Sequence, residues 1–281
     1  MSLKLMYITN RTDIAQIAEN AGVDRIFVDL EYIGKNLRQG GMDTVQNRHS
    51  IDDIKKIKAV ISKSELLVRC NPIHNATDEY GSTEDEIKKI IDVGADIIML
   101  PYFKTADEVK RFIKAVNGKA KTILLFEHKD AVNNIDEILE INGIDEAYIG
   151  LNDLSLSYNL KFMFQLLQDG TVESICDKFK AKNISYGFGG VASIDKGLLP
   201  GKFVVKEHYR LKSSSVILSR SFCKIETESN IDDIIFKFNN GISDIRKLEN
   251  ECISNENNPV FFEQNRLETE KRIKNIIAEL G

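Results

Sequence analysis

The sequence has few cysteines, and the four that it has lie far apart in the chain. No two of them form a CxxC pair, so the spacing typical of a zinc site is absent and a disulfide framework has little support. We therefore expect reduced and buried thiols at all four positions, which are Cys70, Cys176, Cys223 and Cys252.

A strong charge of one sign is also lacking. The 38 basic residues stand against 43 acidic ones, and the formal charge of −5 provides no field that would hold a nucleic acid or an anionic membrane surface. No apolar run approaches the roughly 18 residues of a membrane-spanning helix. Met1–Asn10 lacks a basic leader followed by an apolar stretch and a cleavage site. We therefore expect no nucleic-acid partner, no membrane contact and a cytoplasmic location.

The chain does contain the apolar fraction of an ordinary folded protein, with 42% hydrophobic and 29% charged residues. Its 281 residues are enough to bury a sizeable core. The length leaves open two ordinary domains or one α/β barrel with additions, because barrels commonly need about 250 residues.

Along residues 1–225, short apolar and β-branched runs alternate with amphipathic stretches long enough for helices. The expected strands are Lys4–Ile8, Arg25–Leu30, Leu66–Arg69, Ile97–Leu100, Thr122–Phe126, Ala147–Ile149, Ser185–Phe188 and Val216–Leu218. The expected helices are Asp13–Ala21, Ile51–Ile61, Glu84–Val93, Ala106–Val116, Asn134–Ile141, Val172–Lys182 and Gly201–Leu211. This alternation predicts the α/β fold of a (β/α)8 TIM barrel rather than an open doubly wound sheet.

Residues 226–281 have a different pattern. Ile231–Ser254 and Phe261–Leu280 predict two long amphipathic helices, joined by the polar segment Asn255–Pro259. We expect this C-terminal helical extension to pack on the barrel or to reach a neighbouring subunit in a homo-oligomer. A solvated helical tail is the alternative.

Candidate functional residues are expected where the strands end, because barrel enzymes hold their chemistry at the C-terminal ends of the strands. The second strand ends in Asp29 and is followed by Glu31, and the third ends in Arg69. The fifth strand is followed by Glu127, and the sixth by Gly150–Ser155. These charged side chains are therefore predicted to share one rim of the barrel.

Two of the carboxylates, Glu127 and Asp153, follow consecutive strands and are placed to share a hard divalent cation, which prefers oxygen ligands. The alternative is that each only caps a following helix. Arg69 would bring its guanidinium fork into the barrel mouth, where it suits a carboxylate or an enolate oxygen. A salt bridge to Asp29 or Glu31 is its competing role, and both roles can hold at once.

Five stretches of this region resemble, in order, the signature stretches of the HpcH/HpaI aldolase and citrate lyase β-subunit family, part of the phosphoenolpyruvate/pyruvate-domain superfamily. They are Phe27–Glu31, Leu67–Pro72, Gly94–Pro101, Phe126-Glu127 and Ile149–Ser155. The similarity covers roughly residues 20–160. Gly187–Cys223 is similar to the late barrel segment of a subgroup of the family.

The resemblance implies the barrel fold, often with a C-terminal helix exchanged between subunits. It implies Mg²⁺ or Mn²⁺ held by Glu127 and Asp153 and chelated by a pyruvate-like 2-keto acid or an acyl-CoA carbonyl. It implies that Arg69 steadies the carbonyl and the developing enolate, and that the backbone amides of Asn152 and Asp153 receive the substrate carboxylate. Further expected substrate-binding residues in these stretches are Gly150 and Pro101.

The chemistry that follows is the cleavage of a carbon–carbon bond. Such a cleavage leaves an enolate, and an ion and a guanidinium at the oxygen where charge develops lower its barrier. We therefore predict a retro-aldol or retro-Claisen lyase that acts on a small anionic substrate. The alternatives are other enolate chemistry on phosphoenolpyruvate- or pyruvate-like substrates, and a non-catalytic barrel that binds an acidic metabolite.

One position departs from the aldolase pattern. Aldolases of this family carry a histidine for proton transfer directly after Asp-x-Glu, and Tyr32 stands there instead. A phenol with a pKa near 10 is a poor base at neutral pH, so that mechanism cannot be carried over unchanged. The citrate-lyase branch usually has Asp-Leu-Glu-Asp at this place, and the chain keeps only the first three residues.

The long connection Gly34–Ser50 follows Tyr32 and holds basic residues among glycines. Our hypothesis is that it folds over the site, binds a phosphate or carboxylate and supplies His49 as the missing base. Asp29 and Glu31 would then orient a metal-bound water or this loop. The alternative is a solvated loop in which Ser50 caps the next helix.

Weaker indications come from three other histidines and a glycine tract. His128 is expected to cap a helix or to support a ligand rather than bind the metal, and His74 could reach the mouth beside Arg69. His208 is expected at the surface or at an interface. Gly187–Gly190 looks like a phosphate-binding turn, although a tight turn needs glycine equally.

Overall fold

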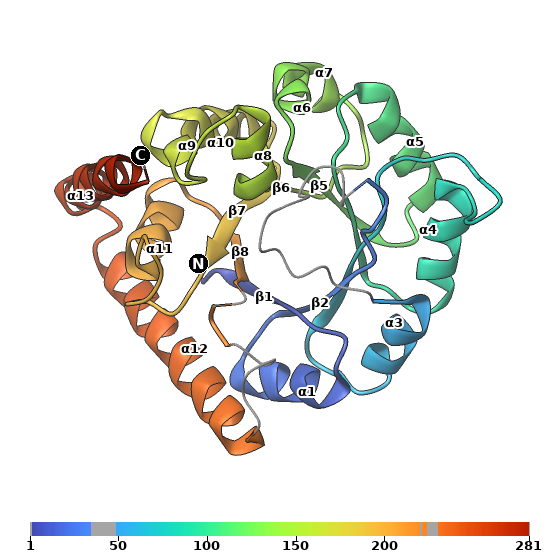
Figure 1. The fold of residues 1–281 in the computed structure, drawn as a ribbon, viewed down its shortest axis with the longest axis horizontal. Coiled ribbons are helices and arrows are strands. Elements are labelled where there is room, and N and C mark those ends of the chain that lie inside the picture. The colour runs from blue at the N-terminus through green and yellow to red at the C-terminus, as the bar shows by residue number, and fades with distance from the viewer. Residues whose placement is uncertain (1, 35–48, 220, 224–229, 281) are drawn as a thin grey trace.

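The computed structural model describes residues 2–34, 49–219, 221–223 and 230–280. Eight parallel strands close into a barrel in chain order, and β8 pairs back with β1 (Figure 1). They are β1 (Lys4–Ile8), β2 (Arg25–Asp29), β3 (Glu65–Arg69), β4 (Ile97–Leu100), β5 (Lys121–Phe126), β6 (Glu146–Ile149), β7 (Ser185–Val191) and β8 (Ser215–Leu218). The predicted TIM barrel with a C-terminal helical extension is confirmed.

Helices surround the barrel, as Figure 1 shows. They are α1 (Thr12–Ala21), α3 (Ile51–Lys58), α4 (Thr83–Asp92), α5 (Ala106–Val116), α6 (Lys129–Asn133), α7 (Ile135–Ile138), α8 (Leu151–Ser157), α9 (Gln165–Gln168), α10 (Thr171–Ala181) and α11 (Gly201–Arg210). The helix predicted over Asn134–Ile141 is present but shorter, since α7 ends at Ile138, and the preceding helix α6 was not predicted. The short helices α8 and α9 were not predicted.

Two apolar layers account for the continuous apolar strands. Parallel strands that lie under helices are buried on both faces. The side chains in the middle of such a strand are therefore apolar whether they point inward or outward. One set of side chains packs against the helices. The other fills the barrel interior and consists of Met6, Phe27, Leu67, Ile97, Met99, Ile123, Leu125 and Tyr148.

Charged residues close the floor of the barrel, where the strands begin. Arg25 is fully buried, and its two Nη atoms donate to Glu146 at 2.7 and 2.5 Å. Its Nε donates to Glu65 at 2.9 Å. Because this end is filled by a paired guanidinium, the open space that a ligand needs lies at the other end of the strands.

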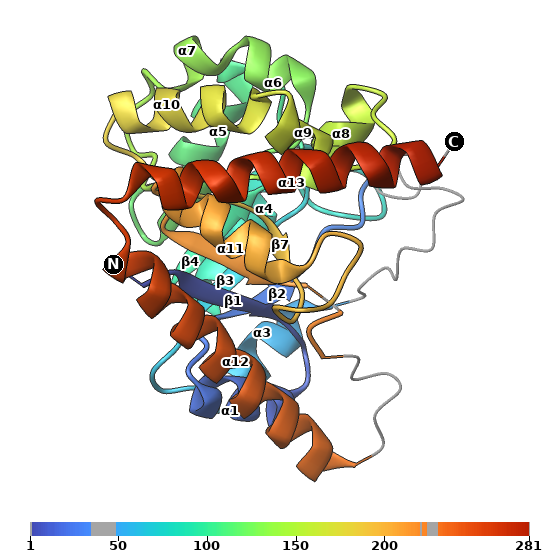
Figure 2. The same cartoon turned by 90° about the vertical axis from the view of Figure 1, so that its left-hand side faces the viewer.

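The two C-terminal helices, α12 (Ile231–Ser254) and α13 (Pro259–Glu279), pack against the outside of the same barrel (Figure 2). α12 contacts α1 and α11, and α13 contacts α11 and α9. α13 begins two residues before the predicted start, because Asn258 caps it and Pro259 takes the first helical position. A homo-oligomer stays a prediction. In the part of the chain that the structure describes, no helix combines the length and apolarity needed to cross a membrane.

All four cysteines are buried, as predicted. Burial raises the pKa of Cys70 well above its ordinary value and raises the pKa of Cys176 and of Cys252 to about 12. These thiols are therefore protonated at neutral pH and are poor nucleophiles.

The prediction that His208 lies at the surface was wrong. Its side chain is fully buried and stacks on the ring of Phe188, with centroids 3.8 Å apart and an interplanar angle of 5°. Nδ1 lies 2.8 Å from the Ser213 hydroxyl. Burial lowers the pKa of His208 to about 3 from an ordinary value of 6.5.

This histidine predicts a loss of stability in acid. Below pH 6.5 His208 is protonated in the unfolded chain, whereas in the folded chain it stays neutral down to about pH 3. The free energy of unfolding should therefore fall by about 2 kcal/mol between pH 7 and pH 5 from this group alone. Urea titrations at both pH values should show a smaller fall for His208→Phe. Equal falls in the two proteins would contradict the assignment.

Candidate active site

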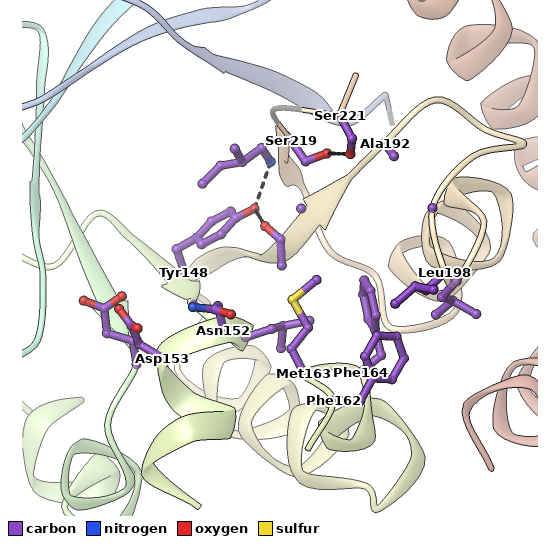
Figure 3. Close-up of a pocket in the computed structure, with 18 of the residues that line it drawn as sticks. Tyr148, Asn152, Asp153, Phe162, Met163, Phe164, Ala192, Leu198, Ser219 and Ser221 are labelled. Carbon is purple, nitrogen blue, oxygen red and sulfur yellow. Dashed lines mark hydrogen bonds between the residues drawn. The ribbon is translucent and has the colours of Figure 1, made fainter. Parts of the chain in front are cut away.

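A cavity of about 440 Å³ opens where the strands end (Figure 3). The ends of β5, β6, β7 and β8 form its walls, together with the loops that follow them and the side chain at the end of β3. Its described lining residues are Arg69, Leu125, Glu127, Tyr148, Gly150, Leu151, Asn152, Asp153, Phe162, Met163, Phe164, Gly189, Gly190, Ala192, Gly197, Leu198, Leu199, Ile217, Ser219 and Ser221. The rim predicted to hold chemistry is thus hollow.

Both predicted metal ligands line this cavity. Glu127 follows β5 directly and is 3% exposed, and Asp153 lies in the first turn of α8 and is 9% exposed. The backbone N–H of Tyr102 donates to Glu127 Oε1 at 3.0 Å. Each carboxylate is therefore held by its own element, and both border the same space.

Arg69 lines the same cavity and is fixed from behind by two buried carboxylates. Its Nε and Nη2 each donate to Asp29 at 2.8 Å, and Nη1 lies 3.2 Å from Glu31. Burial by itself lowers the pKa of Arg69, but the negative charges of Asp29, Glu31 and Glu127 outweigh it and hold the pKa well above its ordinary value. The guanidinium is a permanent positive charge with one orientation.

Gly150 brings the backbone close to Glu127. A Cβ at Gly150 would lie 2.9 Å from Glu127 Oε2 and 3.0 Å from Glu127 Cβ, which is closer than carbon and oxygen atoms pack. Because glycine has no side chain at this position, the Glu127 carboxylate has room to lie against the backbone of Gly150. No left-handed backbone conformation is involved, because the φ of Gly150 is −82°.

Gly150→Ala is accordingly expected to displace the Glu127 carboxylate. Because displaced ligands typically cost 10- to 100-fold in metal affinity, we expect Mg²⁺ or Mn²⁺ to bind about tenfold more weakly or worse in calorimetry. Gly190→Ala is the matched control, since a Cβ there meets only ordinary contacts at 3.6 Å. Equal metal affinities of the two variants would contradict the expectation.

Several predicted residues lie outside the described lining of this cavity. Asp29 and Glu31 are each 1% exposed and sit behind Arg69. Pro101 is buried in the loop after β4, next to Tyr102. None of the three is among the described residues that line the cavity, and Asp29 and Glu31 reach it through Arg69.

The predicted base His49 borders a second cavity of about 280 Å³ together with His74 and Tyr32. His49 Nδ1 accepts the backbone N–H of Asp29 at 3.0 Å, which leaves Nε2 to carry the proton of the neutral ring. His74 lies in this second cavity and not beside Arg69. Most of the Gly34–Ser50 connection falls outside the described residues.

Two smaller predictions about this region have clear outcomes. His128 caps α6, since its Nδ1 accepts the backbone N–H of Asp130 at 3.1 Å, so the capping role is confirmed. Ser50 caps α3 in a capping box. The turn predicted over Gly187–Gly190 was wrong, because the tract belongs to β7, with a register shift against β8.

Sequence reasoning missed the residues that complete the cavity wall. Tyr148 is buried, and its hydroxyl donates to Gly189 O at 2.6 Å and accepts the N–H of Ile217 at 2.9 Å. It thereby ties together β6, β7 and β8. The apolar wall was missed too, and its only signal was the run Phe162-Met163-Phe164 after a polar tract, which is too short to assign.

The donor set suits a hard divalent cation. Two buried carboxylates face one cavity, and Mg²⁺ is commonly held by one or two carboxylates while waters and substrate oxygens complete its shell. Within the described ranges, no cluster of three or more His, Cys, Asp or Glu side chains could enclose a metal by itself. Glu127 and Asp153 thus fit an open metal site and not a closed structural one.

Comparison with known proteins finds relatives of this chain. The family model HpcH/HpaI aldolase/citrate lyase matches residues 4–165. The chain is 24% identical over 174 residues to a 2-keto-3-deoxy-L-rhamnonate aldolase of Escherichia coli O1:K1 and 29% identical over 175 residues to that of Escherichia coli O157:H7. Each match covers 51% of this chain and only 57% of the relative.

Solved structures share the fold. An HpcH/HpaI aldolase from Desulfitobacterium hafniense DCB-2 has a TM-score of 0.57 at 15% identity and covers 78% of this chain and 86% of its own. An HpcH/HpaI aldolase/citrate lyase family protein from Burkholderia cenocepacia J2315 has a TM-score of 0.61 at 14% identity, with coverages of 83% and 95%. Because the family model matches more than half of the sequence, the chain belongs to the HpcH/HpaI aldolase/citrate lyase family.

Proposed function

We propose that the protein is a divalent-metal-dependent carbon–carbon lyase that cleaves a small 2-keto acid or an acyl-CoA-type substrate through an enolate. The observation that carries this proposal is the convergence of one locked guanidinium and two buried carboxylates on one cavity. Membership of an aldolase/citrate lyase family supports it. The names of the matched relatives, which are aldolases of a 2-keto acid, support it further.

In this proposal, Glu127 and Asp153 hold Mg²⁺ or Mn²⁺. When bound, such an ion polarises the substrate carbonyl and stabilises negative charge on its oxygen. Arg69 points its fixed fork at the same oxygen, where charge develops as the carbon–carbon bond breaks. Asp29 and Glu31 would be positioning residues, since they hold Arg69 and are not among the described lining residues of the cavity.

The first turn of α8 would receive the substrate carboxylate. The opening N–H groups of a helix have no partners within the helix and favour anions. Asn152 and Asp153 supply such N–H groups beside the metal ligands, and the Asn152 side chain also lines the cavity. The carboxylate and the keto oxygen of one small molecule would then be held together, which fixes the bond to be broken.

The test is turnover of defined substrates. The protein is incubated with Mg²⁺ and a panel of 4-hydroxy-2-keto acids and β-hydroxyacyl thioesters, and the release of pyruvate or acetyl-CoA is followed. Release that depends on the metal supports the proposal. Tight binding of these compounds without any release would instead indicate a non-catalytic metabolite-binding barrel.

The base is the open part of the mechanism, and His49 remains the candidate. If it takes part in proton transfer, His49→Ala should abolish turnover of a substrate found in that panel and remove a limb of the pH profile of kcat. His74→Ala is the control, because His74 borders the same second cavity. An unchanged kcat in His49→Ala would overturn this role. Tyr32 is not a substitute base, because the partial loss of solvent around it and the charge of Glu86 raise its pKa further.

A further inference from the structure

The cavity has two chemically different ends. Figure 3 shows Asp153 at one side and Phe162, Phe164 and Leu198 at the other. Among the described lining residues, the charged side chains are those of Arg69, Glu127 and Asp153. We call the other side the apolar end, and it is lined by Phe162, Met163, Phe164 and Leu198.

The wall of the apolar end is held in place by packing and by a hydrogen bond. The rings of Phe162 and Phe164 meet edge to face, with centroids 5.4 Å apart at 65°. The backbone N–H of Phe162 donates to the side chain of Gln165 at 2.8 Å, which anchors the loop to α9. Both rings are largely buried. A preformed apolar surface therefore exists before any ligand arrives, and its ordering costs nothing on binding.

Leu198 extends this surface to the mouth of the cavity. It is 69% exposed, whereas its neighbour Leu199 is 4% exposed. Both lie in the loop between β7 and α11, and Leu198 lies on the side of the cavity opposite Asp153. A bound apolar chain would cover Leu198 and remove it from water, which favours binding of that chain.

The hydroxyl groups among the described lining residues already have partners, and the other uncharged polar side chain of this lining is that of Asn152. The hydroxyls of Ser219 and Ser221 lie 2.8 Å from each other. The hydroxyl of Tyr148 is held by Gly189 O and the N–H of Ile217. A chain that carries several hydroxyls would give up its bonds to water against Phe162, Phe164 and Leu198, whose side chains offer no hydrogen-bond partner, and this weakens its binding.

We propose that the protein selects 4-hydroxy-2-oxo acids whose chain beyond C4 is an alkyl or aryl group, so that the aldehyde product is apolar. This rests on the proposed function, because it takes the 2-oxo acid part to lie at Arg69, Glu127 and Asp153. The chain beyond C4 then extends along Phe162 and Leu198. A cavity of about 440 Å³ is of the size that holds such a small acid with a short chain.

The reaction balances without any redox partner. The C3–C4 bond breaks, and its electron pair stays on C3 as the enolate of pyruvate. The proton of the C4 hydroxyl leaves, C4 becomes the aldehyde carbon, and one proton is delivered to C3. One substrate thus gives one pyruvate and one aldehyde.

Binding of unreactive probes tests the selectivity apart from turnover. N-alkyl oxamates repeat the substrate skeleton, with the amide nitrogen at the place of C3, and they cannot be cleaved in this way. In calorimetry with Mg²⁺, we expect N-butyl oxamate to bind roughly tenfold more tightly than N-(2,3-dihydroxypropyl) oxamate. Oxamate alone reports the 2-oxo acid part of the site.

Two substitutions at the apolar end test whether its residues cause the preference for N-butyl oxamate. Leu198→Asn and Met163→Gln replace partly exposed apolar groups by polar ones of similar size, so the fold should persist. Combined, they should narrow the tenfold preference to about twofold. Leu267→Asn is the matched control, because Leu267 is a 52% exposed leucine on α13 that does not line the cavity. The ratio of kcat/KM for an alkyl over a polyhydroxylated 4-hydroxy-2-oxo acid of equal length should follow the same order.

The outcomes separate this inference from the proposed function. If oxamate binds but the two N-substituted probes bind equally, or the dihydroxypropyl compound binds better, the selectivity is wrong and the lyase proposal stands. A preference that survives Leu198→Asn with Met163→Gln also overturns the inference. If oxamate does not bind and no pyruvate is released from any substrate, the proposed function fails and takes the inference with it.

Discussion

Glu127→Gln is expected to abolish measurable Mg²⁺ or Mn²⁺ binding and to lower kcat/KM on the order of 10³-fold. Glutamine can still accept the N–H of Tyr102, which Glu127 accepts at 3.0 Å, so this backbone contact is kept while the charge is lost. A hard cation then keeps a single carboxylate, Asp153, and loses the one in front of Gly150. Calorimetry with each metal and a pyruvate-release assay measure the two effects.

Glu108→Gln is the matched control for this variant. Glu108 also accepts backbone N–H groups, those of Lys104 and Thr105, but it caps α5 and does not line the cavity. Metal affinity and kcat/KM should therefore stay unchanged in Glu108→Gln. Stoichiometric metal binding retained in Glu127→Gln would refute the metal assignment, whatever the rate.

Arg69→Lys is expected to lower kcat/KM at least about 100-fold while the chain still folds. Lysine keeps the positive charge, but it cannot donate to both oxygens of Asp29 and reach Glu31 at once, as the fork of Arg69 does. Arg69→Met is expected to be worse, because it leaves two buried carboxylates without their cation, which costs about 3–5 kcal/mol of stability. Urea unfolding and steady-state kinetics measure the two losses separately.

Arg210 offers a control of similar burial. It is 14% exposed, like Arg69, and it pairs with Glu207 and Glu173 on the outside of the barrel. Arg210→Lys should reduce stability modestly and leave kcat/KM unchanged. If Arg69→Lys behaves in the same way, Arg69 is a structural residue and the enolate role is wrong.

Much of the fold could be read from the sequence because its signals are local. Each strand is a short apolar run between helices, and burial on both faces makes such runs continuous. The errors also have local causes. The short helix α6, which ends at Asn133 just before the predicted helix, was missed, and β7 carries glycines that resemble a turn. In β7 a Cβ at Gly187 would lie 2.3 Å from the Ser215 hydroxyl, a contact made only across paired strands.

The candidate site divides in the same way. Glu127, Asp153 and Arg69 could be placed together from sequence, since the ends of parallel barrel strands meet at one rim. The separate positions of Asp29, Glu31 and His49 could not be predicted from sequence. They depend on the direction in which each side chain points at the end of β2 and in the loop that follows it. Closure of the barrel puts the first two behind Arg69 and turns His49 toward the second cavity.

The sequence by itself therefore determined the barrel and the identity of its three charged cavity residues. Each strand and the polar residues at its end can be recognised from a short run of consecutive residues. Only the tertiary structure decided that Gly150 makes room for Glu127 and that both Asp29 and Glu31, rather than one of them, pair with Arg69. It also decided that Phe162 and Leu198, 36 positions apart, line the same apolar end. These features are contacts between residues that lie far apart in the sequence. Such contacts form only when the chain packs, and no local sequence pattern predicts them.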